Sequence, residues 1–167
     1  LGPATAVGEE LMGIPSFDTP DYSVLFAEEK EMIANMKKVF LMVAGSAIKK
    51  YGANLEEHQQ LLMAAANILN EIYMSESTLL RAEKNAKRFG EDAQDIQIAM
   101  AKLYLYNAVE IVIKNGKEGI ISFAEGDEQR MMLMGLKRYT KYTNYPNVVA
   151  LRNKIAEKLS TENKYCF

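Results

Sequence analysis

Apolar side chains recur at steps of three and four residues along most of this 167-residue chain. That spacing places them on one side of an α-helix, which completes a turn in about 3.6 residues. No proline interrupts residues 21–145. The pattern therefore predicts an all-α fold, an antiparallel up-and-down helical bundle of four main helices plus a shorter C-terminal helix.

The first long helix is predicted to begin at Pro20 and to end before Gly52. Thr19 can cap the free amides at its start, and a proline at the first helical position loses no hydrogen bond. Gly52 can take the left-handed closing position. The residues expected on the core face are Met32, Met36, Phe40, Val43 and Ala47.

The second helix carries the most regular apolar seam in the chain. Asn54 and Glu57 have the spacing of a capping box at its start, and Phe89–Gly90 ends it. Steps of four and three residues alternate along the seam, as in packed antiparallel bundles. The predicted seam residues are Leu61, Ala65, Ile68, Ile72, Ser75, Leu79, Ala82, Ala86 and Phe89.

The third helix has the broadest apolar surface, so we expect it to be the most buried element. Asp92 can cap it, and the apolar spacing continues to about Ala124. Gly116 and Gly119 each weaken a helix by about 1 kcal/mol, and the helix could break or kink there. We predict continuity because the apolar spacing persists across both glycines.

A fourth and a fifth helix follow. Gly126–Asp127 forms the corner before the fourth, predicted from Glu128 to about Tyr142. Pro146 stops that helix and begins the fifth. The residues expected to face inward from the fifth are Val148, Leu151, Ile155 and Leu159. The methionines of the fourth helix form either an adaptable binding surface or core filler, and we expect core; they are Met131, Met132 and Met134.

The expected organisation is a linker or docking arm over 1–19, a bundle domain over 20–160 and a tail over 161–167. A short helix at 4–12 is compatible with the arm. The first residue is Leu1 rather than methionine. We therefore expect a piece of a longer protein or a processed product.

Composition fits a single domain with one sizeable core, at 49% hydrophobic residues. The formal net charge of −2 argues against a nucleic-acid partner, because phosphate contacts need a basic surface. Seven acidic residues and one basic residue give 1–36 a charge of −6, whereas eight basic and two acidic give 129–167 a charge of +6. Such ends either attract each other or form a membrane or partner surface.

Cys166 is the only cysteine, which excludes an internal disulfide and fits a reducing cytoplasm.

Candidate chemistry is sparse. The one histidine, His58, cannot supply the paired motifs of a di-iron bundle site, and we expect it to be solvated. Asn107 and Glu110 interrupt an apolar segment and share a face. Glu110 is either a buried base with a raised pKa or part of a solvated face, and we expect the latter. No catalytic residue, metal ligand or cofactor-binding residue is assigned.

Basic and aromatic residues alternate near the end of the fourth helix. Such alternation can hold anionic headgroups or phosphates. The candidate interaction surface consists of Lys137, Arg138, Tyr139 and Lys141.

The segment 126–139, the helices before it and the opening residues 1–4 resemble the extreme carboxyl-terminal part of bacterial acyl-CoA dehydrogenases. The segment reads GDEQRMMLMGLKRY. The similarity is to the branch related to very-long-chain acyl-CoA dehydrogenase, in which a further helical domain follows the catalytic unit. The resemblance implies that this chain is that additional domain.

Two departures from the family pattern concern chemistry. The family's catalytic glutamate lies in an aromatic-Glu-Gly-Thr sequence, whereas 123–127 reads FAEGD and lacks the threonine. Glu125 is therefore a look-alike of the catalytic base. The flavin-contacting glycine-rich segment is also absent. The resemblance implies that FAD is bound by the parent enzyme and not by this fragment.

The resemblance also implies the partners. In related enzymes the extra domain packs over the catalytic domains of the same polypeptide and leaves the enzyme a homodimer rather than a tetramer. It implies a bacterial cytoplasmic protein, with peripheral contact at the inner membrane left open. The alternatives are a free-standing helical interaction module that binds a protein or an anionic membrane, and an enzyme using Glu110 or Glu125.

Overall fold

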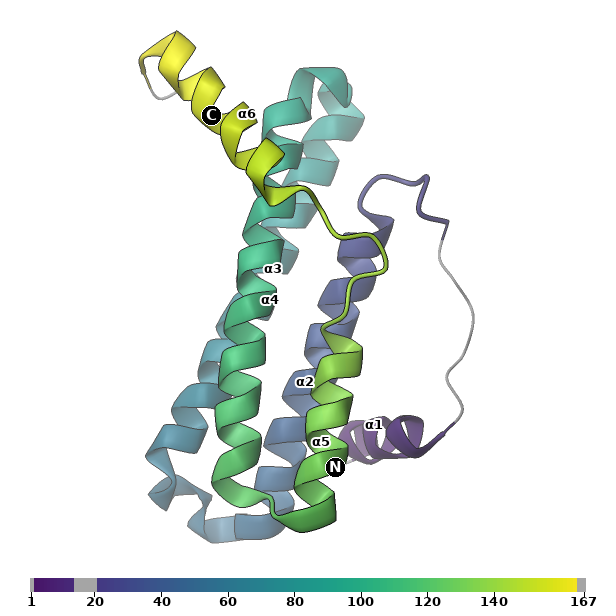
Figure 1. Ribbon diagram of the computed structural model, residues 1–167, viewed down its shortest axis with the longest axis vertical. Helices are drawn as coiled ribbons and strands as arrows, with labels where there is room; N and C mark the ends of the chain where they lie inside the picture. Colours follow the sequence, from purple (N-terminus) through teal and green to yellow (C-terminus); the bar gives the residue numbers. More distant parts are fainter. Residues whose placement is uncertain (1, 14–20, 165–167) are drawn as a thin grey trace.

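The computed structural model describes residues 2–13 and 21–164, and all regular structure in these residues is helical (Figure 1). The predicted all-α class is therefore confirmed. The α-helices are α1 Gly2–Met12, α2 Ala27–Tyr51, α3 Gln59–Phe89, α4 Asp95–Phe123, α5 Gly126–Tyr139 and α6 Val148–Glu162. Short 3₁₀ helices at Gly52–Glu57 and Asp92–Gln94 precede α3 and α4.

Helices α2 to α5 form the up-and-down bundle (Figure 1). Helix α3 packs against α2 and α4, and α5 also packs against α2 and α4. Because α5 is much shorter than α3 and α4, it covers one half of the bundle, and the α3–α4 hairpin projects beyond it. Helix α1 crosses α2 beside α5, and α6 leans away from the bundle while contacting α4.

The start of α2 differs from the prediction. The helix begins at Ala27, because Phe26 before it has a left-handed backbone (φ 63°) that ends helical hydrogen bonding in the upstream direction. The Phe26 side chain is 1% exposed, so its burial in the core compensates for that backbone conformation. The predicted cap Thr19 and Pro20 lie outside the described residues.

The start of α3 also differs. Asn54 and Glu57 lie within the 3₁₀ helix, and α3 follows His58 without a side-chain cap. The tighter 3₁₀ turn brings Leu55 against the core before α3 begins. The predicted seam is otherwise buried, except that Ala65 is half-buried and Phe89 is 55% exposed at the helix end.

Helix α4 is continuous through both glycines, as predicted, and buries more residues than any other described helix. A Cβ atom at Gly116 would lie 3.0 Å from Cδ1 of Leu136, and one at Gly119 would lie 3.0 Å from Cγ1 of Val43. The glycines therefore do not interrupt α4. They allow α5 and α2 to approach it closely.

Helices α5 and α6 carry two corrections. Among the α5 methionines only Met132 is in the core, at 3% exposed, while Met131 and Met134 are 38% and 70% exposed. Helix α6 has no buried residue; three of its predicted inward residues are half-buried and Leu159 is 41% exposed. Helix α6 contacts α4, and one neighbour cannot enclose it, whereas Met131 and Met134 lie on the part of α5 that α2 and α4 leave exposed. Cys166 lies outside the described residues.

Candidate interaction surfaces

The four residues of the predicted interaction surface do not form one accessible patch. Lys137 and Lys141 are exposed, but Tyr139 is 2% exposed. The half-buried Arg138 donates a hydrogen bond through Nη1 to the carbonyl oxygen of Glu10 (3.5 Å). The alternating sequence spans both the outer and the inner side of α5, so only its lysines face water freely.

Helix α1 covers this end of α5. Glu10 pairs with Lys38 of α2 (2.7 Å), and the ammonium of Lys38 lies 5.3 Å from the centre of the Tyr139 ring. Burial and then the negative charge of Glu10 raise the pKa of Tyr139 to about 12. Helix α1 of the acidic end and α5 of the basic end thus lie side by side here, while the ion pair of Glu10 is made with Lys38 of α2.

The candidate acid–base residues are separate and exposed. Glu110 and Glu125 are both on the surface, and Asn107 accepts a hydrogen bond from Arg152 at 3.4 Å. His58 stacks on Tyr51, with ring centroids 3.6 Å apart. Within residues 2–13 and 21–164 no three metal-binding side chains gather. Neither Glu110 nor Glu125 is therefore a buried base in the described structure.

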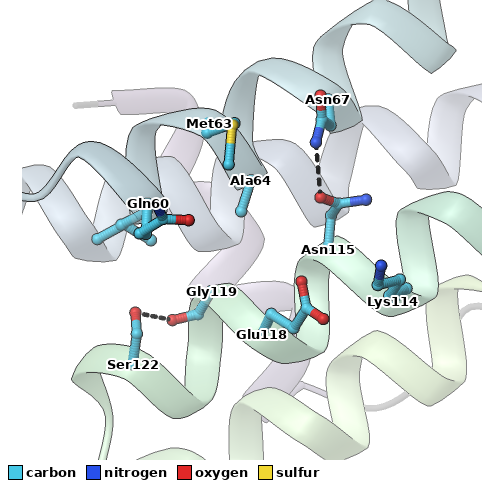
Figure 2. Close-up of a pocket in the computed structure, with 10 residues that line it drawn as sticks. Gln60, Met63, Ala64, Asn67, Lys114, Asn115, Glu118, Gly119 and Ser122 are labelled. Carbon is cyan, nitrogen blue, oxygen red and sulfur yellow. Dashed lines mark hydrogen bonds between the residues drawn. The ribbon is translucent and has the colours of Figure 1, made fainter.

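A polar groove of about 460 Å³ lies between α3 and α4 (Figure 2). Asn67 of α3 donates to Oδ1 of the buried Asn115 of α4 (3.0 Å), and Asn115 donates to the carbonyl of Ile111 (2.8 Å). Ser122 donates to the carbonyl of Gly119 (2.7 Å). The Asn67–Asn115 bond links α3 to α4, and the other two bonds lie within α4 and satisfy polar groups at the edge of the core.

A second groove, of about 230 Å³, lies between α3 and α2 on the other side of α3. All its lining side chains are apolar, and α3 continues the same stripe beyond it. We call this surface the α2–α3 apolar face. It consists of the groove residues Phe40, Ala44, Ala47, Ile48, Leu55, Leu61, Leu62, Ala65, Ala66 and Leu69, with Tyr73 and Leu80.

The prediction missed this face although the sequence contains its signal. Leu62, Leu69, Tyr73 and Leu80 follow steps of seven, four and seven residues, which align them on one side of α3. They are 37%, 49%, 69% and 55% exposed. A more regular apolar seam runs one position earlier along the same helix, and that seam faces the core.

The segment Asp92–Phe123 is long and apolar enough to cross a membrane by length and composition. In the bundle its apolar residues contact α2, α3 and α5. In the bundle 33% of the apolar window is buried, so core packing accounts for part of its composition.

Comparisons with known proteins converge on one group. A family model described as acyl-CoA dehydrogenase, C-terminal domain, matches residues 35–138. A probable acyl-CoA dehydrogenase of Bacillus subtilis (strain 168) is 31% identical over 162 residues, which is 97% of this chain and 27% of that protein.

A solved structure agrees. An acyl-CoA dehydrogenase from Bacillus anthracis, complexed with FAD, matches with a TM-score of 0.87 and 32% identity, covering 98% of this chain and 27% of that one. The resemblance to acyl-CoA dehydrogenases found in the sequence is therefore confirmed. Placement in the very-long-chain branch stays a prediction. The chain spans about a quarter of the length of these relatives.

Proposed function

We propose, from the premise that this chain belongs to the acyl-CoA dehydrogenase C-terminal domain family, that it is an accessory packing domain of an FAD-dependent enzyme. The parent enzyme would remove hydrogen from the α and β carbons of an acyl-CoA thioester in fatty acid oxidation. The domain would catalyse nothing by itself and would serve interdomain packing and homodimer organisation. We also propose that the parent enzyme belongs to the branch related to very-long-chain acyl-CoA dehydrogenase.

The observation that carries this proposal is the fold match. Almost the whole chain superposes on 27% of an acyl-CoA dehydrogenase complexed with FAD. The side chains fit the role, because the acidic candidates are exposed and separate while an apolar face is left uncovered. A reaction needs a positioned acid or base near a closed site, and packing needs an apolar surface.

The cofactor and location follow from the same proposal. FAD would be held by the remainder of the enzyme, and the enzyme would work in the bacterial cytoplasm. Glu125 is exposed at the corner before α5, outside any enclosed site that could position it against a substrate.

The test uses the polypeptide that contains this sequence and a version that ends before it. The complete enzyme is expected to carry flavin and to oxidise an acyl-CoA, and the shortened one to lose thermal stability and dimer mass. The 167-residue chain alone should bind no FAD. Stoichiometric flavin on the isolated chain, or acyl-CoA oxidation by it, would contradict the assigned role.

A free-standing module that binds anionic membranes is the second candidate, favoured by the exposure of Lys137 and Lys141. Sedimentation with vesicles containing anionic lipid tests it. Binding that disappears in the double variant K137E/K141E would support the module. Absent or unchanged binding would count against the membrane-binding module. Tyr139 is buried in the core and cannot contact a membrane, which already weakens the candidate surface.

A further inference from the structure

The α2–α3 apolar face is unusual for a surface exposed to water. Four large apolar side chains on one stripe of α3 are each more than a third exposed, and Ile48 across the groove is 46% exposed. Single exposed apolar residues are common, but a continuous row beside an apolar groove indicates a contact surface.

We infer that this face is the site at which the bundle docks onto the remainder of its own polypeptide, and that the docking element is an amphipathic helix with aliphatic side chains. This inference rests on the proposed function. A groove between two helices accepts a third helix whose apolar residues are spaced by three and four positions. The groove volume of about 230 Å³ suits a few aliphatic side chains and excludes a large ligand.

The lining chemistry selects among occupants. No charged residue lines the groove, so it offers nothing to a lipid headgroup or an acidic peptide. The bundle accounts for 27% of each matched relative, so most of their length is available as a tethered partner. A tethered partner has an effective concentration of about millimolar, which favours it over a second copy in dilute solution.

Ion pairs border the exposed stripe and complete the expected anatomy of an interface. Lys37 of α2 pairs with Glu76 of α3 at 2.6 Å, and Lys30 of α2 pairs with Glu83 of α3 at 2.9 Å. An apolar centre with a polar rim is the usual arrangement of contact surfaces. Both pairs bridge α2 and α3 beside the exposed stripe.

The opposite side of α3 provides a matched control. Met74 is 48% exposed and Leu69 is 49% exposed, on the same helix. Met74 belongs to the α4 side of α3. It lies seven residues after Asn67, which itself lies four residues after Met63, and Asn67 bonds to α4. A glutamate at either position leaves the bundle core untouched.

The experiment compares L69E and M74E in the complete flavin-loaded enzyme. Limited proteolysis is expected to release the bundle roughly tenfold faster from L69E than from the parent, since a charge buried in an apolar contact weakens docking. M74E should match the parent. Tyr73→Ser, which removes apolar area without adding charge, should lie between them. Equal release from all forms would overturn the inference.

Two further measurements separate the possible failures. If L69E turns the dimer into monomers while the bundle stays protected, the face binds a second copy and the inference is wrong. If the complete polypeptide carries no flavin and oxidises no acyl-CoA, the proposed function fails. A flavin-loaded, active enzyme with unchanged proteolysis of L69E contradicts only the docking site.

Discussion

Helices α4 and α6 carry similar apolar spacing, but they lie at opposite extremes of burial. Eleven residues of α4 are buried, whereas none of α6 is. Helix α4 contacts α2, α3, α5 and α6, and α6 contacts α4. Periodicity therefore identifies the inward side of a helix. The depth of burial depends on how many neighbours can approach that side.

Small residues explain the close approach to α4. Gly116 and Gly119 lie where a Cβ atom would meet side chains of α5 and α2. Helix α6 has no glycine and meets α4 through long polar side chains such as Arg152 and Lys154. Side chains of that length keep helix axes apart and leave the apolar residues half-covered.

The largest effect is expected from truncating a fully buried side chain of α4. Ile120 is 0% exposed, and Ile120→Ala should lower the free energy of unfolding by about 2–5 kcal/mol through lost burial and the cavity left behind. Urea unfolding followed by circular dichroism measures it. A loss below about 1 kcal/mol would mean that α4 is not the centre of the core.

Overpacking the glycine contact should have the next largest effect. Gly119→Val places a branched side chain against Val43 and Leu61, and the free energy of unfolding should fall by about 1–3 kcal/mol. The control is Gly8→Ala in α1, where a Cβ meets nothing within 4 Å. That change should stabilise by up to about 1 kcal/mol. Stabilisation by both changes would contradict the close approach at Gly119.

Much of the fold could be predicted because it depends on local spacing. The continuity of α4 across Gly116 and Gly119 follows from the apolar steps on either side. The start of α2 could not be predicted, because the left-handed backbone of Phe26 is stabilised by distant core contacts. The burial of α6 could not be predicted either, because apolar spacing does not indicate how many helices pack against it.

The candidate surface was harder to predict than the fold. Lys137 and Lys141 are exposed, and their role as an interaction surface stays a prediction. Tyr139 is covered by α1, which lies more than 120 residues earlier in the chain. The α2–α3 apolar face has a readable stripe on α3. Its groove also needs α2 alongside, and pairing between helices is not encoded in either stripe alone.

Tyr142, in the segment between α5 and α6, provides a test of how tightly this segment is packed. Its ring is 4% exposed and its hydroxyl has no hydrogen-bond partner among the described residues. Tyr142→Phe keeps the ring and removes the unpaired hydroxyl, so the free energy of unfolding should rise by about 1 kcal/mol. Thermal unfolding measures the gain. A loss would show that the hydroxyl is bonded in solution.

The same residue gives a pH dependence. Burial and then the charges of Glu29 and Glu28 raise the pKa of Tyr142 above its ordinary value of 10.0. Below pH 10 both states keep the proton. As pH rises further the unfolded chain loses it first, so stability falls. Tyr142→Phe should lose less stability across that range than the parent.

A smaller effect is expected where α6 is held to α4 by charge. Lys154 and Asp95 form an ion pair whose side chains are 41% and 52% exposed. Asp95→Asn should cost no more than about 1 kcal/mol, and added salt should remove the difference. The double variant with Lys154→Gln should cost no more than the single one. A larger loss that persists in salt would place α6 deeper than its exposure indicates.

The smallest effect is expected at the outer end of α6. Leu159 is 41% exposed, so Leu159→Ala removes little buried area and should change the free energy of unfolding by no more than about 0.5 kcal/mol. The matched measurement is Ile120→Ala under the same conditions, because both changes truncate an aliphatic side chain in a helix. If Leu159→Ala instead cost about 2 kcal/mol, its side chain would be enclosed in solution by a second copy of the chain or by packing of α6 along α4. Dependence of that loss on protein concentration would identify the second copy, because association stabilises by mass action.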